Sequence, residues 1–171
     1  DWLEAKRRIE AGDPRAVTMM SSYDNYVLAS EDPVLKANSA RIEEYKKANL
    51  LPEHTAGIMG EPLRGATRSQ SDKVSFVGVA PANAAEWQSA AMRFNSAFGM
   101  KLQGDLHVVM VDSSIVPAND AVPYTAAVKA HWTGLDFGKR AIAKNGVILV
   151  IGVSGNSKVD WAQATTGMPF G

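Results

Sequence analysis

The segment Lys144-Asn145-Gly146-Val147-Ile148-Leu149-Val150-Ile151-Gly152-Val153 decides the fold class of this chain. Asn-Gly pairs favour positive φ, so Asn145-Gly146 predicts a tight turn. The aliphatic run that follows does not alternate with polar residues, as a strand covered on one face would. It therefore predicts a central strand that is buried on both faces, in a sheet sandwiched between layers of helices.

Strands and helices alternate around this segment. The predicted elements are, in chain order, a strand over 74–79, a helix over 87–98, a strand over 106–111, a helix over 122–132, a short helix over 139–144 and a return strand over 158–165. Helical spacing gives the first of these helices one apolar face, formed by Trp87, Ala91, Phe94 and Phe98. The order of elements predicts an α/β fold with a mixed central sheet sandwiched between helices.

The N-terminal part of the chain is helical in character. Asp13-Pro14 and Asp32-Pro33 each combine an N-cap residue with a proline at the first helical position. They predict helices over 15–29 and 34–49, after a short helix over 2–10. Glycine and proline punctuate residues 51–73, which predicts an irregular linker that crosses the surface. We therefore predict a helical N-terminal extension over 1–60 and an α/β domain over 61–171.

Composition excludes several classes of function. The 171 residues carry 18 basic and 18 acidic side chains, so the charge balance does not favour nucleic-acid binding. The chain has no cysteine, which excludes thiolate metal sites and cysteine nucleophiles. Its longest aliphatic run is the size of a strand, too short to span a membrane. The chain starts at Asp1-Trp2 and ends at Phe170-Gly171, which predicts a part of a longer protein whose membrane anchor lies outside this sequence.

Motifs for nucleophilic or phosphate chemistry are weak. The sequence has neither a Gly-x-Ser-x-Gly elbow nor a phosphate-binding glycine loop. The histidines are His54, His107 and His131; His107 falls in a predicted strand and His131 on a predicted helix, where a histidine is more typical of a core or interface position than of catalysis. A glycine-flanked loop runs into Lys139-Arg140, where backbone N–H groups could hold an anion; a solvated loop is the simpler interpretation.

Oxygen ligands for a hard cation are the remaining candidates. Asp112 follows the predicted strand 106–111, where open α/β sheets place their binding crevices. Asp136 and Asn145 lie in predicted loops. Carboxylates and amides of this kind bind Ca²⁺ or Mg²⁺. Asp112, Asp136 and Asn145 are therefore the predicted metal ligands, although no EF-hand spacing organises them.

The second half of the chain combines four features. They are Tyr124 in a helix, Trp132-Thr133-Gly134, a short basic helix, and the Asn-Gly strand start at 144–150 with its return strand. Together with the helix over 87–98 and the strand over 106–111, this pattern resembles the TPM domain family across residues 74–165. These are the thylakoid-phosphatase-like domains of membrane-tethered proteins. The Trp-Thr-Gly followed by the Asn-Gly strand start is the most specific part of the resemblance.

The resemblance implies an α/β sandwich that is tethered to a membrane and lies outside the cytoplasm, as in the periplasm. Members of the family are described as acid phosphatases, as Ca²⁺-binding domains or as accessory proteins of membrane complexes. This chain departs from the pattern in two ways. The acidic residue near the family's first helix has no counterpart in 78–83, and the extension before residue 60 is not part of the usual domain.

Two functions follow from the resemblance and its departures. The first is an accessory or interaction module that binds a protein partner in or at a membrane. The alternative is a phosphatase-like hydrolase of phosphoesters, whose reaction a divalent metal could assist. In the hydrolase, Asp112 and Asp136 supply carboxylates, Asn145 orients a cation or water, and Lys139 and Arg140 neutralise the phosphate. Since function depends on sites rather than folds, the resemblance does not choose between enzyme and partner.

Overall fold

The chain forms an α/β fold, as the sequence predicts. The computed structural model describes residues 7, 10, 11, 39–54, 73–133, 142–155 and 158–167. Its elements are α3 (Ser39–Lys47), β1 (Val74–Val77), α4 (Ala84–Leu102), β2 (Asp105–Asp112), the 3₁₀ helix η2 (Ala118–Asp120), α5 (Ala121–Thr133), β3 (Gly146–Val153) and β4 (Val159–Thr166). The predicted helix over 15–29 lies outside the described residues, as does nearly all of that over 2–10. Of the predicted helix over 139–144, residues 142–144 are described and are not helical.

The sheet is mixed and has the order β1-β2-β3-β4. β1, β2 and β3 are parallel, and β4 returns antiparallel to β3. The register pairs Asp105 with Gly146 at one end of β2 and Asp112 with Val153 at the other. β3 is therefore an inner strand with a partner on each side, which confirms the prediction made from its continuous aliphatic run.

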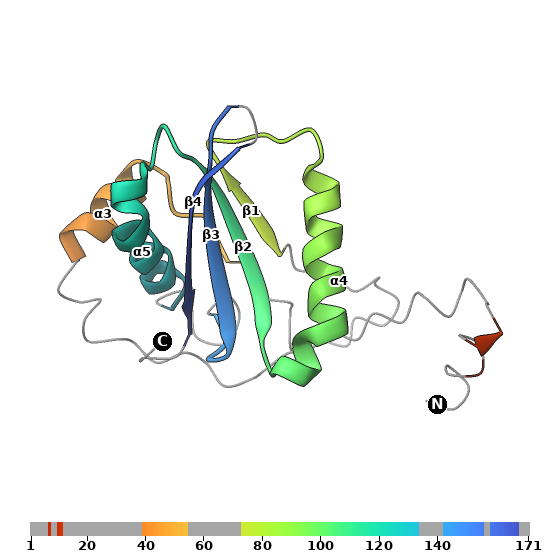
Figure 1. Cartoon of the computed structure of the whole chain (residues 1–171). Coiled ribbons are helices and arrows are strands. Elements are labelled where there is room, and N and C mark those ends of the chain that lie inside the picture. Colours follow the sequence, from red (N-terminus) through yellow and green to blue (C-terminus); the bar gives the residue numbers. More distant parts are fainter. Residues whose placement is uncertain are drawn as a thin grey trace, which may run out of the picture.

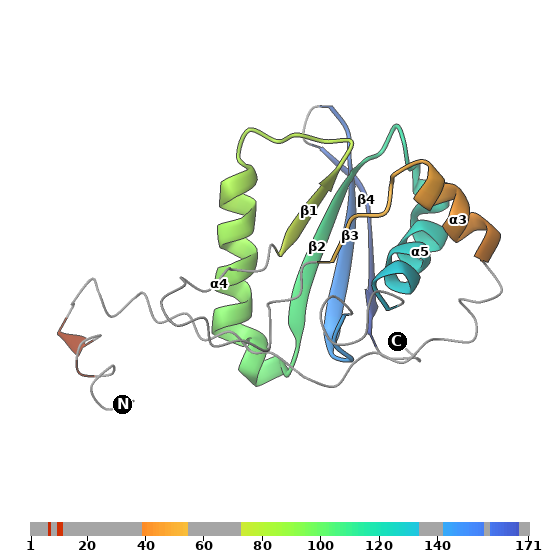
Figure 2. The ribbon, with the colours of Figure 1, turned by 180° about the vertical axis from the view of Figure 1, so that it is seen from behind.

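Helices cover both faces of the sheet, as Figures 1 and 2 show. Successive residues of a strand point to opposite faces, so each inner strand feeds two cores. On one side, Val109 and Val111 of β2 and Ile148 and Val150 of β3 pack with α5. On the other side, the intervening residues of the same strands pack with α4; they include Val108, Met110 and Ile151.

The two helical connections run over opposite faces of the sheet. α4 connects β1 to β2 on one face, and α5 lies between β2 and β3 on the other (Figures 1 and 2). Because β1, β2 and β3 follow one another in one direction across the sheet, connections over opposite faces have opposite hands. One of them is therefore left-handed, although nearly all connections of this kind are right-handed.

Residues 39–54 share the core of the α5 side. Tyr45 packs edge-on against Tyr124 with ring centroids 5.2 Å apart. The Tyr124 hydroxyl donates to the Leu50 carbonyl at 2.6 Å, and the Trp132 indole donates to the Pro52 carbonyl at 2.6 Å. The predicted surface linker over 51–73 therefore begins inside the protein, because α5 supplies hydrogen-bond donors to its backbone. Its residues 55–72 lie outside the described part.

The helices found in the described residues are each too short or too polar to cross a lipid bilayer.

Gly152 is required by the packing of β3 against β4. A Cβ atom at this position would lie 2.1 Å from Trp161 Nε1. The indole cannot move aside easily, because it is buried and donates to the Val116 carbonyl at 3.0 Å.

We expect Gly152→Ala to lower the free energy of unfolding by about 1–3 kcal/mol, as measured by urea titration. Gly155→Ala is the control, since a Cβ there meets no atom within 4 Å; equal losses in both variants would contradict the packing argument.

Candidate functional site

The predicted metal ligands do not meet at one place. Asp112 lies at the carboxyl end of β2, whereas Asn145 precedes β3 beside the opposite end of β2, where its carbonyl accepts from the Asp105 amide at 3.3 Å. A strand of this length spans about 23 Å at roughly 3.3 Å per residue, so Asp112 and Asn145 cannot share one ion. Asp136 lies outside the described residues, as do Lys139 and Arg140.

Both described residues make local hydrogen bonds. Asp112 Oδ1 accepts from the Ser114 amide at 2.8 Å, which closes the turn after β2. Bonds from the side chain and backbone of Ser114 hold the pKa of Asp112 below its ordinary value. Asn145 Nδ2 donates to the Gln103 carbonyl at 2.5 Å and so joins the end of α4 to the turn before β3. Among the described residues, no group of three His, Cys, Asp or Glu side chains is arranged to hold a metal ion.

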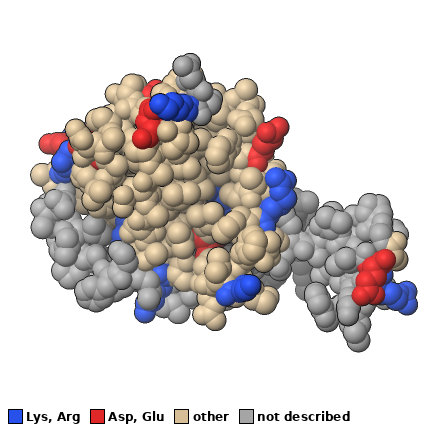
Figure 3. Space-filling view, viewed as in Figure 1, with Lys and Arg blue, Asp and Glu red and all other residues tan. Residues whose placement is uncertain are grey.

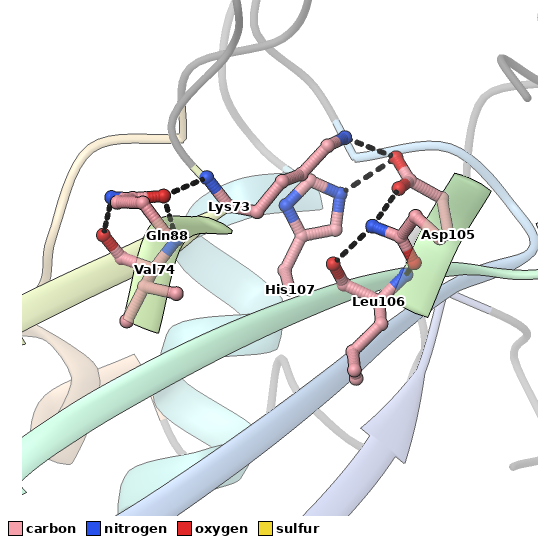
Figure 4. A network of polar contacts seen from close by, with 7 residues as sticks. Lys73, Val74, Gln88, Asp105, Leu106 and His107 are labelled. Carbon is pink, nitrogen blue, oxygen red and sulfur yellow. Dashed lines mark hydrogen bonds and ion pairs between the residues drawn. The ribbon is translucent and has the colours of Figure 1, made fainter. Parts of the chain in front are cut away.

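The structure instead gathers polar side chains at the amino end of β2 (Figure 4). Asp105 Oδ2 accepts from Lys73 Nζ at 2.8 Å and lies 3.0 Å from His107 Nε2. Asp105 Oδ1 accepts from Asn95 Nδ2 at 3.0 Å. Lys73 directly precedes β1, Asn95 lies in the middle of α4, and His107 lies two residues further along β2. Their shared carboxylate therefore ties the start of β1, the middle of α4 and the start of β2 together.

Asn95 also completes the sheet where β1 is missing. Its side chain accepts from the Leu106 amide at 2.8 Å and donates to the Leu106 carbonyl at 2.9 Å. β1 starts opposite Val108, so the backbone of Leu106 has no strand partner on that side. The Asn95 amide takes the place of a neighbouring strand, which explains why a polar residue is buried in the middle of α4.

Gln88 does the same for the outer edge of β1. Its Oε1 accepts from the amides of Lys73 and Val74 at 2.8 and 3.0 Å, and its Nε2 donates to the Val74 carbonyl at 2.6 Å (Figure 4). An unpaired strand edge is a template for association with other chains. Two amide side chains of α4 thus satisfy the backbone of β1 and β2, and together they fix the rotation of the helix about its own axis.

The ion pairs around Asp105 stabilise its charged form. Burial by itself raises the pKa of Asp105, but the hydrogen bond and charge of His107, with the charge of Lys73, outweigh it and lower the pKa to about 2. On the far side of His107, its ring lies 4.7 Å from that of His54 and 5.8 Å from that of Trp132. His54 and His107 are 5% and 4% exposed, so substrate has no direct access to this cluster. We assign it a role in stability.

The surface of α4 is the second candidate. The side of α4 that packs against the sheet carries the small residues Ala91, Asn95 and Gly99, which lie four residues apart along one line of the helix. The apolar face predicted from the sequence is consequently divided. Ala91 is buried and Trp87 is partly buried, whereas Phe94 and Phe98 remain 40% and 46% exposed. Their rings contact each other with centroids 5.1 Å apart.

Further apolar residues are exposed on α4 and on β4. Met100 and Leu102 at the end of α4 are 72% and 63% exposed. On the same side of the sheet, α4 packs on β1 and β2. There β4 presents the exposed Ala162 and Ala164, which pair with Ile151 and Leu149. Figure 3 shows the middle of this view of the molecule with few charged side chains. α4 and β4 thus expose several apolar side chains to solvent, beside the exposed charged residues Glu86, Arg93 and Lys101 of α4.

Comparisons of the chain with protein-family models, with curated proteins and with solved structures find no match. The resemblance to the TPM family stays a prediction of the sequence, and the candidate site rests on the geometry.

The sequence patterns did not single out Lys73, Asn95 or Asp105. Lys73 and Asp105 each precede an apolar run, where a polar residue ordinarily caps a turn or faces solvent. The one available signal was Asn95, a polar residue at the same helical line as Ala91 and Gly99. Its partners depend on which strand lies beside β2, and this is decided by tertiary structure.

We expect Asp105→Asn to lower the free energy of unfolding by about 3 kcal/mol near neutral pH, because Lys73 and His107 lose a buried charged partner. The measurement is urea unfolding followed by circular dichroism. The control is Asp120→Asn, which removes the exposed ion pair of Asp120 with Arg41. That variant is expected to lose less than about 1 kcal/mol. Equal effects of the two substitutions would show that the Asp105 cluster adds no special stability.

The acid dependence of stability provides a further expected result. The folded-state pKa of Asp105 is lowered from 3.8 to about 2. Its contribution of roughly 2 kcal/mol is therefore fully present above about pH 4 and is lost as the pH falls through about 2. Asp105→Asn should unfold with a shallower pH dependence in that window than the unmodified protein. Parallel curves for the two proteins would contradict the lowered pKa.

Proposed function

We propose that this chain is a protein-interaction module that binds a partner through the outer surface of α4. The observation that carries the proposal is the exposure of Phe94 and Phe98, two aromatic side chains in mutual contact on a helix whose small residues face the sheet. Exposed apolar surface of this kind marks binding sites in soluble domains, because it lowers the free energy of the complex when it is covered.

The geometry supports a contact in which α4 packs into a groove of the partner or against a helix of the partner. Aromatic residues are enriched in the centres of protein interfaces, where they contribute most of the binding free energy. Phe94 and Phe98 lie one turn apart on a rigid helix, and the hydrogen bonds of Gln88 and Asn95 hold that helix in place. A partner therefore meets a preformed surface and loses little free energy in ordering it.

The resemblance to TPM domains adds the setting to this proposal. It supports a location beside a membrane, outside the cytoplasm, with a partner in or at that membrane. The alternative function, a metal-assisted phosphoester hydrolase, needs Asp112, Asp136 and Asn145 at one centre. Since Asp112 and Asn145 lie at opposite ends of β2, the geometry favours the interaction module.

Site-specific photo-crosslinking tests the proposal. Phe94 or Phe98 is replaced by p-benzoylphenylalanine in the full-length protein, and cells are irradiated. The expected result is a discrete protein adduct at both positions, whose partner is identified by mass spectrometry.

Val122 is the control position, because it is 63% exposed but lies on α5, on the other side of the sheet. Adducts of the same mass and yield at Val122, or the absence of adducts at both α4 positions, would contradict the proposal.

A further inference from the structure

The exposed surface of α4 has a self-complementary pattern. Five residues three or four apart lie along one line of the helix, and all are exposed: Glu86, Ala90, Phe94, Ala97 and Lys101. Glu86 is the one acidic residue of α4, and it stands in the first turn. Lys101 stands in the last turn. The line thus has an acid at one end, a base at the other and an aromatic ring near its centre.

An antiparallel copy of the same helix pairs the two charged ends of this line with each other and its two alanines with each other. If two copies of α4 cross between Arg93 and Phe94, Glu86 faces Lys101 of the second copy and Ala90 faces its Ala97. Phe94 then faces Arg93 of the second copy, an arrangement that favours a cation–π contact. The alanines allow the two backbones to approach closely, so the aromatic rings can pack beside them.

We infer that two copies of this chain associate through their α4 helices, antiparallel and centred at Arg93 and Phe94. This inference rests on the proposed function and names the partner as a second copy. A two-fold interface uses the same surface on both subunits, so it requires self-complementary chemistry. The arrangement of α4 satisfies this requirement twice, since the Glu86–Lys101 pair forms at both ends of the contact.

The charges at the two ends are available for such a contact. Within the described part of the chain, no ion pair involves Glu86 or Lys101. They lie about 22 Å apart at 1.5 Å per residue, too far to pair within one helix. An antiparallel copy brings both pairs together, whereas a parallel copy would place like charges side by side. The charges therefore select the antiparallel orientation.

Sedimentation velocity of the full chain at a series of concentrations tests the inference. We expect a reversible monomer–dimer equilibrium, weak because one pair of helices buries a small area. Phe94→Glu should abolish the dimer, whereas Val122→Glu, on the other side of the sheet, should leave it unchanged. Circular dichroism verifies that both variants are folded.

A charge-reversal pair identifies the partner as a second copy. Glu86→Lys and Lys101→Glu each place like charges at both ends of the contact, so each variant alone should dimerise roughly tenfold more weakly. An equimolar mixture of the two restores both opposite-charge pairs and should recover the dimer. High salt should weaken the recovery, because it screens exposed charges.

The possible outcomes separate this inference from the proposed function. A chain that stays monomeric at the highest concentration, or a mixture that dimerises no better than the single variants, overturns the second copy as partner. If Phe94 still forms a photo-adduct with a different protein in that case, the interaction module stands with another partner. If it forms none, both fail.

Discussion

The structure depends on one buried amide, that of Asn95. Its side chain donates to and accepts from the backbone of Leu106, where β1 does not reach. Each buried backbone group left without a partner would lower the free energy of unfolding by about 1–3 kcal/mol. This penalty keeps the side of α4 that carries Asn95 against the sheet. The rotation of the helix follows from this constraint. Ala91 and Gly99 face the sheet together with Asn95, and Phe94 and Phe98 face solvent.

Asp105 extends the same constraint to the rest of the fold. Its carboxylate binds Asn95, Lys73 and His107, and the His107 ring contacts His54. A buried charge is tolerated only when its hydrogen-bonding capacity is filled. The cluster therefore specifies how the start of β1, the middle of α4 and the segment after α3 come together. The aromatic residues Tyr124 and Trp132 secure that last segment from α5.

The two sides of the sheet differ as a result. α3 and α5 both lie on one side, where Trp132 and Tyr124 are fully enclosed. On the other side α4 lies over β1 and β2, close to the sheet because its inner residues are small. The apolar surface that remains there is a consequence of the way the backbone of β2 is satisfied. A surface required by the fold is rigid, and a rigid surface is well suited to recognise a partner.

The sequence by itself determined the α/β class and the central strand 146–153, because a long aliphatic run after Asn-Gly is stable only when both faces are covered. It also located the remaining strands and the helices before and after β2, since these follow from local periodicity and polarity. Only the tertiary structure decided that Asp112 and Asn145 lie at opposite ends of β2 and that Asp105 joins Lys73 to His107. Those relations depend on strand order and on the rotation of α4, and residues far apart in the chain set both. The exposed Phe94 and Phe98 show the difference most directly: helical spacing put them on one apolar face with Trp87 and Ala91, and the hydrogen bonds of Asn95 left only these two phenylalanines turned toward solvent.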